Sequence, residues 1–442
     1  MNTNKLFFKY VSLNVLGMIG ISLYILADTF FIAQALGSNG IASLNLSIPA
    51  YGVIHGIGLM LGLGGASRFS ILNAQRKTKE AQSVYTQSLL FGVIVGIVFS
   101  VIGVIGADNI AHMLGANNET FANTSIYLRT LLFFSPFFIL NNAMQSFVRN
   151  DGDPSLAMYG MLLGSFLNIV LDYIFIFPLD MGMFGAALAT SIAPISSLAI
   201  LSIHFRRPTN QLKFVFQGIQ LKVMKDICYL GAAGFINEIA AAVVMFSFNT
   251  IIFMLEGNLG LAAYGIVANI SFVVLSLFTG VAQGAQPLLS DSYGLKDLDK
   301  MKHVLTLSIA TALSISTLIY VSTFIFRDGI ISAFNSDQNL HVKEMAIVGL
   351  LIYFIGFFFA GANTILTTYF SATDQPRLAL FFSLLRGGFI IIPAVLLLSH
   401  LYGMTGVWSS YVVAEAVVIG CIMIKMNPKK RIKQKKVPQK EI

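Results

Sequence analysis

The stretch Met158-Tyr-Gly-Met-Leu-Leu-Gly-Ser-Phe-Leu-Asn-Ile-Val-Leu-Asp-Tyr-Ile-Phe-Ile-Phe177 has the 20 largely apolar residues that a helix needs to cross a bilayer. It nevertheless contains an acid, Asp172, and an amide, Asn168, which project from one helix face because they are four residues apart. An ionised acid at the centre of a membrane helix costs about 2.5–3.5 kcal/mol on insertion scales. Such an acid persists where it faces the protein interior or a water-filled path, so we interpret the pair as a candidate ion or proton site.

The composition of the whole chain is that of a polytopic membrane protein. Of its 442 residues, 56% are hydrophobic and only 11% are charged, and the mean hydropathy is +0.78, whereas soluble domains carry about 25% charged residues. The two cysteines and six histidines show no metal-ligand spacing. We therefore predict no disulfide and no cofactor. A transported Na⁺ or H⁺ is the only ion we expect the chain to bind.

Hydropathy predicts an all-α membrane protein with twelve spans. We place them near residues 7–36, 44–72, 83–107, 124–148, 155–177, 184–205, 223–255, 262–290, 303–326, 342–372, 378–399 and 404–426. The first span is too long for the apolar region of a secretory signal peptide, so we expect it to be retained.

The distribution of Lys and Arg predicts the orientation. With the N-terminus in the cytoplasm, 24 of the 28 basic residues lie on the cytoplasmic side, while Arg129, Arg327 and Lys343 lie outside and Arg386 lies within a span. This asymmetry follows the positive-inside rule, so we expect a multi-pass plasma-membrane protein with both termini cytoplasmic. The net charge of +8 is then explained by the membrane, and we expect no nucleic-acid partner.

The chain repeats itself at an offset of about 220 residues. The segment Gly40–Leu44 matches Gly260–Tyr264, and Gly182–Gly185 matches Gly403–Gly406, at equivalent loop positions. Each half has six predicted spans, so the repeat is parallel, about an axis along the membrane normal. We predict a first lobe over 1–205, a cytoplasmic linker over 206–222, a second lobe over 223–426 and a basic cytoplasmic tail over 427–442.

Four motifs together resemble the multidrug and toxic compound extrusion (MATE) family. They are Asp28-Thr-Phe-Phe-Ile32, Phe147-Val-Arg-Asn-Asp-Gly-Asp-Pro154, Asn168-Ile-Val-Leu-Asp172 and Gly185-Ala-Ala-Leu-Ala-Thr190. The second motif is most similar to the staphylococcal subgroup of that family. The resemblance covers essentially the whole chain. It implies a V-shaped exporter of twelve helices in two lobes that exchanges Na⁺ or H⁺ for organic, often cationic, compounds.

The resemblance also implies a cation site in the first lobe. The family places an Asp on its first helix, an Asn-x-x-x-Asp pair on its fifth and a Thr on its sixth. Asp28, Asn168, Asp172 and Thr190 match those types and spacings. A further polar position on the fourth helix falls on Gln145, and an acid on the seventh helix falls on Glu238. No proline precedes Pro49, so a bend in the first helix would have to come from Gly17 or Gly20.

Helix geometry predicts independently that the cluster can form. At 1.5 Å per residue, Asp28, Asp172 and Thr190 each lie about 8–12 Å below the outer end of their helix, and Asn168 lies about one turn deeper. Carboxylate, amide and hydroxyl oxygens suit a hard cation, and two neighbouring carboxylates favour proton uptake by one of them. The sequence leaves Na⁺ and H⁺ open.

Each of these residues also has a structural interpretation. Asn168 and Asp172 could be a hydrogen-bonded pair that packs helices, and Thr190 could bond its own backbone. Glu238 lies at mid-span, which favours a substrate or ion role. Arg386 and Glu415 lie at similar depths on two arms of one hairpin, so we predict a structural ion pair first and a substrate-pathway role second.

The predicted function is secondary active multidrug export by alternating access, driven by Na⁺ or H⁺, in a protein that is not an enzyme and that we expect to be monomeric. The expected partners are small organic, often cationic, substrates and the lipid bilayer. A flippase for lipid-linked precursors, from a related superfamily, is the first alternative, but it would favour a broadly basic cavity. A gated ion channel is the second, and no recognisable selectivity-filter sequence supports it.

Overall fold

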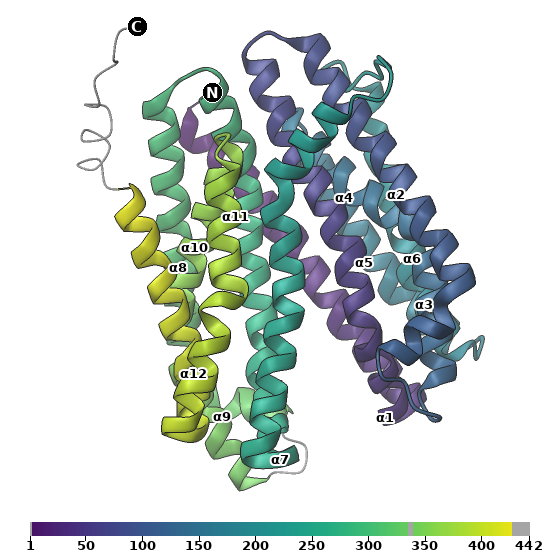
Figure 1. Ribbon diagram of the computed structural model, residues 1–442, viewed down its shortest axis with the longest axis vertical. Helices are drawn as coiled ribbons and strands as arrows, with labels where there is room; N and C mark the ends of the chain where they lie inside the picture. The colour runs from purple at the N-terminus through teal and green to yellow at the C-terminus, as the bar shows by residue number, and fades with distance from the viewer. Residues whose placement is uncertain (1, 335–338, 427–442) are drawn as a thin grey trace, which may run out of the picture.

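The computed structural model describes residues 2–334 and 339–426, which are almost entirely helical (Figure 1). The first half contains α1 (Thr3–Ala74), α2 (Thr78–Met113), α3 (Phe121–Phe133), α4 (Ser135–Asn150), α5 (Pro154–Ile176), α6 (Gly182–Leu201) and the 3₁₀ turn η1 (Ser202–Arg206). The second half contains α7 (Leu221–Gly294), α8 (Leu298–Phe334), α9 (Leu340–Tyr353), α10 (Gly356–Ala372), α11 (Pro376–Leu384), the π-helical turn η2 (Leu385–Phe389) and α12 (Ile391–Met426).

Three glycines divide the longest helical segments into pairs of spans. Gly37, Gly257 and Gly403 have φ values of 62°, 59° and 56°, inside α1, α7 and α12 respectively. Glycine adopts this left-handed conformation without a steric penalty because it has no Cβ. Within the described residues, seven helical segments are long and apolar enough to cross a membrane, or nine if each bent pair is one span. Three of the seven segments are long enough to hold two spans each. Counted in this way, and with each bent pair as one span, the described residues give the twelve predicted spans.

Two of the predicted spans are broken rather than continuous. The expected span 124–148 is divided into α3 and α4, which meet at 52°, and the span 342–372 is divided into α9 and α10, which meet at 46°. Pro136, in the first turn of α4, has no N–H to continue the hydrogen bonding of α3. At the second break, Gly356 lies so close to the ring of Tyr411 that a Cβ there would be 2.5 Å from Cδ1.

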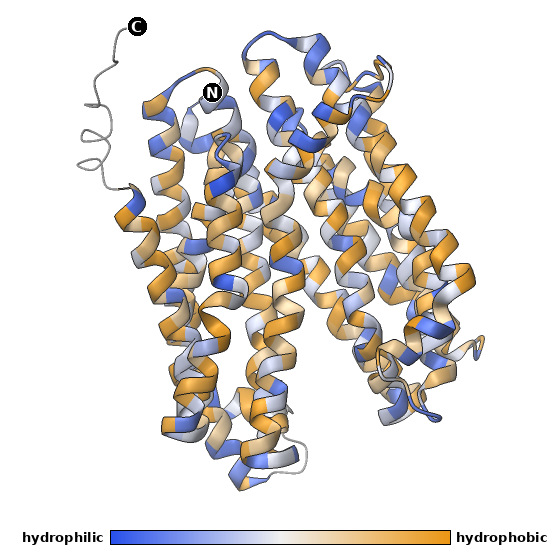
Figure 2. Cartoon of the chain, viewed as in Figure 1, coloured by the Kyte–Doolittle hydropathy of each residue, from blue (hydrophilic) through white to orange (hydrophobic). Residues whose placement is uncertain are grey.

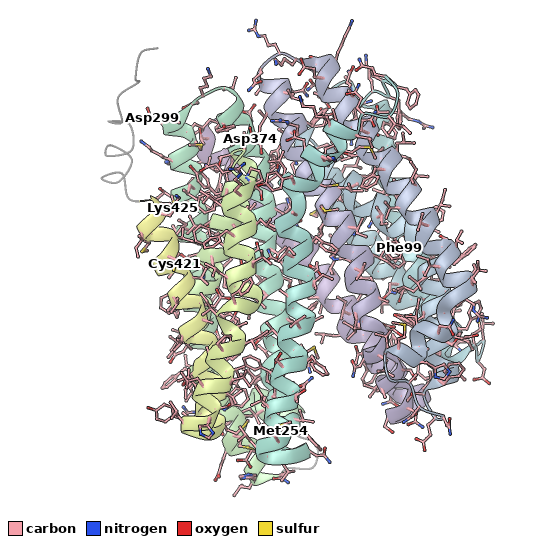
Figure 3. The ribbon with its side chains drawn as sticks, in the orientation of Figure 1. Phe99, Met254, Asp299, Asp374, Cys421 and Lys425 are labelled. Atoms are coloured by element: carbon pink, nitrogen blue, oxygen red, sulfur yellow. The ribbon has the colours of Figure 1, made fainter. Side chains whose placement is uncertain are left out.

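The surface hydropathy follows the arrangement expected in a bilayer. Apolar residues run along the middle of the helices, and hydrophilic residues gather at the two ends of the molecule (Figure 2). Figure 3 labels Asp299 and Asp374 towards the end that carries the N-terminus and Met254 at the opposite end. Towards the Met254 end, the two bundles of helices diverge (Figure 1).

The starts of α1 and α7 each pack into the hydrophobic core of the opposite half. Phe7 and Val11, at the start of α1, belong to the core formed by residues of the second half. Ile227, at the start of α7, belongs to the core of the first half. The predicted lobe boundaries at 205 and 223 stay predictions. The start of each half packs into the core of the other half, so the two cores do not follow these boundaries strictly. The predicted tail over 427–442 lies outside the described residues.

Glycines allow α1 and α7 to approach closely along the contact between the halves. Gly280 and Gly284 of α7 lie against the backbone of Val15 and Val11, where an added Cβ would be 2.9 and 2.7 Å from their Cα atoms. A Cβ at Gly231 would overlap the carbonyl oxygen of Met60. Gly64 packs in the same way, because a Cβ there would overlap the carbonyl oxygen of Ile227.

We predict that Gly231→Ala destabilises the protein. The new methyl group would meet rigid backbone, and overpacking of this kind costs about 1–3 kcal/mol. Thermal unfolding of the purified protein would measure the change. Gly265→Ala, on the same helix, is the matched control, because a Cβ there has no heavy atom within 4 Å and alanine favours a helix by up to about 1 kcal/mol over glycine. An equal loss of stability in both variants would contradict the packing argument.

Arg149 is buried between the halves and bonds only neutral groups among the described residues. It is 1% exposed, and its Nη1 donates to Asn14 and, across to α7, to Gln283 Oε1 at 3.1 Å. Its Nη2 donates to Ser146 Oγ at 3.4 Å. The neighbouring Asn150 donates to Gln286 Oε1 at 2.9 Å. The motif around Arg149 therefore links the end of α4 to α7 and holds the two halves together there.

The connection between the halves lies along α2. The backbone N–H of Val215 donates to Thr86 Oγ1 at 2.9 Å, and Gln87 Nε2 donates to the Gly218 carbonyl at 2.5 Å. Asp151 accepts from the Gln211 backbone N–H at 2.8 Å, so the loop before α5 also holds this segment. The segment that we predicted as a linker is therefore anchored to the first half by side chains.

Candidate functional site: a buried polar cluster in the first half

Close packing of α5 against both α1 and α6 positions the cluster. A Cβ at Gly20 of α1 would be 2.8 Å from Leu162 Cδ2, and one at Gly164 of α5 would be 3.2 Å from the Ala193 carbonyl oxygen of α6. Gly17 and Gly20 therefore serve contact with α5. Asp28 lies about two turns after Gly20, and Asn168 lies about one turn after Gly164. The polar side chains consequently reach one another where the helix axes are close.

The structure brings Asp28, Asn168, Asp172 and Thr190 together. They are 6%, 0%, 0% and 6% exposed, respectively. One orientation of the Asn168 side-chain amide forms hydrogen bonds with both of its polar neighbours. In it the nitrogen donates to Asp172 Oδ2 at 3.1 Å and the oxygen accepts from the Thr190 backbone N–H at 3.3 Å. The carboxyl groups of Asp28 and Asp172 lie next to each other. Thus α1, α5 and α6 contribute to one buried group of oxygen atoms.

The cluster keeps unused acceptor capacity. Asp28 Oδ1 and Asp172 Oδ1 are buried and have no hydrogen-bond partner among the described residues. Buried carboxylate oxygens without donors are costly unless a proton or a cation balances them. Within the same residues, no group of three or more His, Cys, Asp or Glu side chains forms a transition-metal site. The oxygen-only chemistry of the cluster suits a hard monovalent cation or a proton.

Gln145, which the resemblance placed in this site, has other partners. Its Nε2 donates to Asn141 Oδ1 at 3.3 Å and to Ser197 Oγ at 3.4 Å. Ser197 lies on α6 about two turns from Thr190. Gln145 therefore joins α4 to α6 beside the cluster, and the described contacts do not bring it to either acid. Its proposed role in cation coupling stays a prediction.

Two tyrosines that sequence reasoning missed lie next to the acids. Tyr127 of α3 is 4% exposed, and its hydroxyl lies beside the Thr190 side chain. Tyr24 lies one turn before Asp28 and beside Tyr51. The four-residue spacing from Asp28 could have identified Tyr24. No local spacing could have identified Tyr127, because its contact depends on how α3 packs against α6.

We predict that Tyr127→Phe reduces stability modestly. The substitution keeps the ring but removes a buried hydroxyl beside Thr190, and a hydrogen bond made by such a group contributes about 0.5–1.5 kcal/mol. Thermal unfolding would measure the loss. Tyr159→Phe is the matched control, because Tyr159 is 58% exposed. A control variant as destabilised as Tyr127→Phe would disprove the importance of the buried hydroxyl.

Glu238 lies at the contact between the halves and not in the acid cluster. Its Oε2 is 3.3 Å from His55 Nδ1 of α1, and the two side chains are 34% and 26% exposed. His55 also stacks on Tyr51, with ring centroids 5.5 Å apart. Since Tyr51 also lies beside Tyr24, polar side chains extend from the neighbourhood of Asp28 to Glu238. A substrate or ion role for Glu238 stays a prediction.

Arg386 and Glu415 form an ion pair inside the second half. Arg386 Nε donates to Glu415 Oε1 at 2.6 Å, and Glu415 Oε2 accepts from Asn363 Nδ2 at 2.7 Å. Arg386 Nη1 also donates to Thr364 Oγ1 at 2.8 Å. Arg386 lies in the π-helical turn η2, where the backbone departs from regular α-helix. Each charge has several partners, as a structural pair requires, but the structural role itself stays a prediction.

The fold and the buried cluster define a class of protein: an all-helical membrane transporter built from two related halves. The MatE family model matches residues 15–174 and 235–396, so the chain belongs to this family of multidrug and toxic compound extrusion transporters. The two matches begin 220 residues apart, at the offset found by comparing the sequence with itself. The family and its twelve-helix fold are therefore confirmed, and the family consists of transporters rather than enzymes.

Curated relatives and solved structures agree with this assignment. The chain is 28% identical to the multidrug export protein MepA of Staphylococcus saprophyticus over 403 residues, which cover 89% of this chain and 87% of that protein. Identity to MepA of Staphylococcus aureus is 27% over 405 residues, with the same coverage. A structure described as the outward-facing conformation of a multidrug resistance MATE family transporter superposes with a TM-score of 0.90 at 23% identity, over 96% of each chain. A Vibrio cholerae MATE transporter superposes with a TM-score of 0.87 at 21% identity, over 96% of this chain and 98% of the other.

Proposed function

We propose that this protein is a multidrug exporter that couples the entry of Na⁺ or H⁺ to the extrusion of organic, often cationic, compounds. The observation that carries the proposal is the convergence of Asp28, Asn168, Asp172 and Thr190 in the interior of the first half. Acids buried in a membrane protein are energetically costly and therefore rare, and those that occur mark ion or proton pathways. Export of several compounds is also the activity that the name of the MepA relatives states.

The packing of α1 supports a route from cation binding to alternating access. Asp28 lies on the same helical segment as Ser22, whose hydroxyl is 2.6 Å from Ser276 Oγ of α7. Val11 and Val15, further along that segment, lie against the glycines of α7. Binding of a cation at Asp28 and Asp172 neutralises charge and changes how α1 packs against α5. Such a change reaches the contact between the halves through α1 itself.

The direction of export follows from the predicted topology. With both termini in the cytoplasm, as the Lys and Arg distribution predicts, the bundles diverge towards the outside of the cell (Figure 1). Contacts between the halves, such as Arg68 Nη2 with Asp226 Oδ2 at 2.6 Å, then lie on the cytoplasmic side. This arrangement corresponds to an outward-open state, in which the protein accepts the coupling cation and releases substrate. We expect the monomer to suffice for this cycle.

Reconstitution into proteoliposomes tests the proposal. A fluorescent organic cation serves as substrate, and a sodium gradient and a pH gradient are imposed separately. We expect substrate movement against one of the two cation gradients, which identifies the coupling ion. Absence of substrate movement under both gradients, with folded protein in the membrane, would contradict coupled export. Cation flux without substrate exchange would favour a channel instead.

A further inference from the structure

A pocket lined mainly by polar and charged residue types lies beside the contact between the two halves, away from the acid cluster. Its volume is about 810 Å³, and it is formed by the end of α1, the start of α2, the segment before α7 and the start of α7 as far as Tyr229. Most of the residues that line it are polar or charged, and they include Arg68, Lys77, Gln217, Gln220, Lys222 and Lys225. Leu72, Val84, Val223 and Tyr229 supply less polar wall.

The charge of the pocket is positive. Four basic and two acidic side chains line it. Arg68 pairs with Asp226 at 2.6 Å and with Asp374, which is labelled in Figure 3, at 3.4 Å. Lys77 pairs weakly with Glu80, at 3.7 Å. Lys222 and Lys225 form no ion pair with any described residue, so two ammonium groups remain available to a ligand.

Two helices begin at this pocket and add to its positive potential. α2 begins at Thr78 and α7 at Leu221, and the capping residues Lys77 and Gln220 make no side-chain hydrogen bond to either helix start. The first turn of a helix has backbone N–H groups without intrahelical partners, and the helix dipole favours an anion there. Glu80, in the first turn of α2, offsets part of this potential. The lysines and the start of α7 are not offset in this way.

We propose that this pocket binds a phosphate-bearing anion. The anionic oxygens would bind the ammonium groups of Lys222 and Lys225, the side-chain amides of Gln217 and Gln220, and the start of α7. The less polar wall formed by Val223 and Tyr229 suits an attached acyl-glycerol group. The same phosphate chemistry is available from an anionic phospholipid of the surrounding membrane or from a soluble phosphate compound. Because the pocket includes residues of both α1 and α7, its occupant holds the halves in the contact seen here.

Binding of two probes to the purified full-length protein tests this proposal. Phosphatidylglycerol, compared with phosphatidylcholine, represents the lipid source, and sodium pyrophosphate represents the soluble source. Native mass spectrometry gives the affinity for lipid, and thermal stabilisation gives that for pyrophosphate. We expect the double variant Lys222→Gln/Lys225→Gln to lose at least about tenfold in affinity for whichever probe the parent protein binds. Each basic side chain contributes substantially to the attraction of phosphate. The control is Lys296→Gln/Lys302→Gln, which makes the same charge change outside the pocket and should bind within about twofold of the parent.

The outcomes separate the source of the ligand from the existence of the site. Lysine-dependent binding of phosphatidylglycerol alone supports the site and assigns it to lipid, whereas lysine-dependent binding of pyrophosphate supports it and assigns a soluble anion. Equal affinity for phosphatidylglycerol and phosphatidylcholine without pyrophosphate binding would overturn the proposal. Equal weakening of both double variants would also overturn it, because it would indicate diffuse charge attraction.

Discussion

Asp172→Asn is expected to reduce cation-driven export about 100-fold or more while leaving the protein folded. The substitution keeps the size of the side chain but removes the carboxylate that contacts Asp28 and Asn168. Loss of one fully engaged charged ligand costs about 3 kcal/mol, and 1.4 kcal/mol corresponds to a factor of ten. The initial rate of dye export in proteoliposomes under the effective cation gradient measures the change.

Asp180→Asn is the matched control for this experiment. It makes the same chemical change only eight residues away, but Asp180 is exposed and follows the end of α5. We expect export by this variant to equal that of the parent. Full cation-driven export by Asp172→Asn, at equal protein content, would end the proposal that the acid cluster couples cation entry to transport. Equal loss in both variants would show that the assay responds to expression or orientation.

Glu415→Gln is expected to destabilise the protein by about 3–5 kcal/mol, because it leaves the Arg386 guanidinium buried without its counter-charge. The Glu415 side chain is 3% exposed and that of Arg386 is 18% exposed, so water replaces little of the lost interaction. Thermal or denaturant unfolding of the purified protein gives the change. Removing both charges together in Arg386→Met/Glu415→Gln should recover most of the lost stability, because no unpaired charge then remains in the second half.

An exposed ion pair in the same half provides the comparison. Lys343 Nζ is 2.9 Å from Asp328 Oδ1, and the two side chains are 36% and 63% exposed. Asp328→Asn should cost far less stability than Glu415→Gln, because water solvates the remaining lysine. Similar losses in the two single variants, or no recovery in the double variant, would contradict a structural role for the Arg386–Glu415 pair. A selective loss of transport without loss of stability would instead favour a substrate-pathway role.

The proximity of the side chains in the acid cluster could be predicted from the sequence where local rules apply, while their role in cation coupling stays a prediction. Asn168 and Asp172 share a face because of their four-residue spacing, and burial of acids inside a membrane protein follows from the cost of exposing them to lipid. The depths of Asp28, Asp172 and Thr190 follow from the rise per residue of a helix. These rules predicted that the side chains can meet. Gln145 came from the resemblance alone, and its described contacts are with Asn141 and Ser197.

Other features depend on contacts between helices that are distant in sequence. The proximity of Tyr127 to Thr190 requires α3 to pack on α6, and the pairing of Glu238 with His55 requires α7 to meet α1. The breaks before α4 and α10 occur at Pro136 and at Gly356, where Tyr411 packs closely. Hydropathy averages over such positions, so it predicted continuous spans. The exchange of Phe7 and Ile227 between the two cores is likewise absent from any local pattern.

The sequence alone determined that this chain is a twelve-span membrane protein of two related halves, because the bilayer imposes long apolar helices and the repeat preserves their order. It also determined which side chains are too costly to face lipid. Only the tertiary structure decided which of those side chains meet. Their contacts depend on close packing at Gly20, Gly164 and Gly231, and a single added carbon at Gly231 would overlap the backbone of the facing helix.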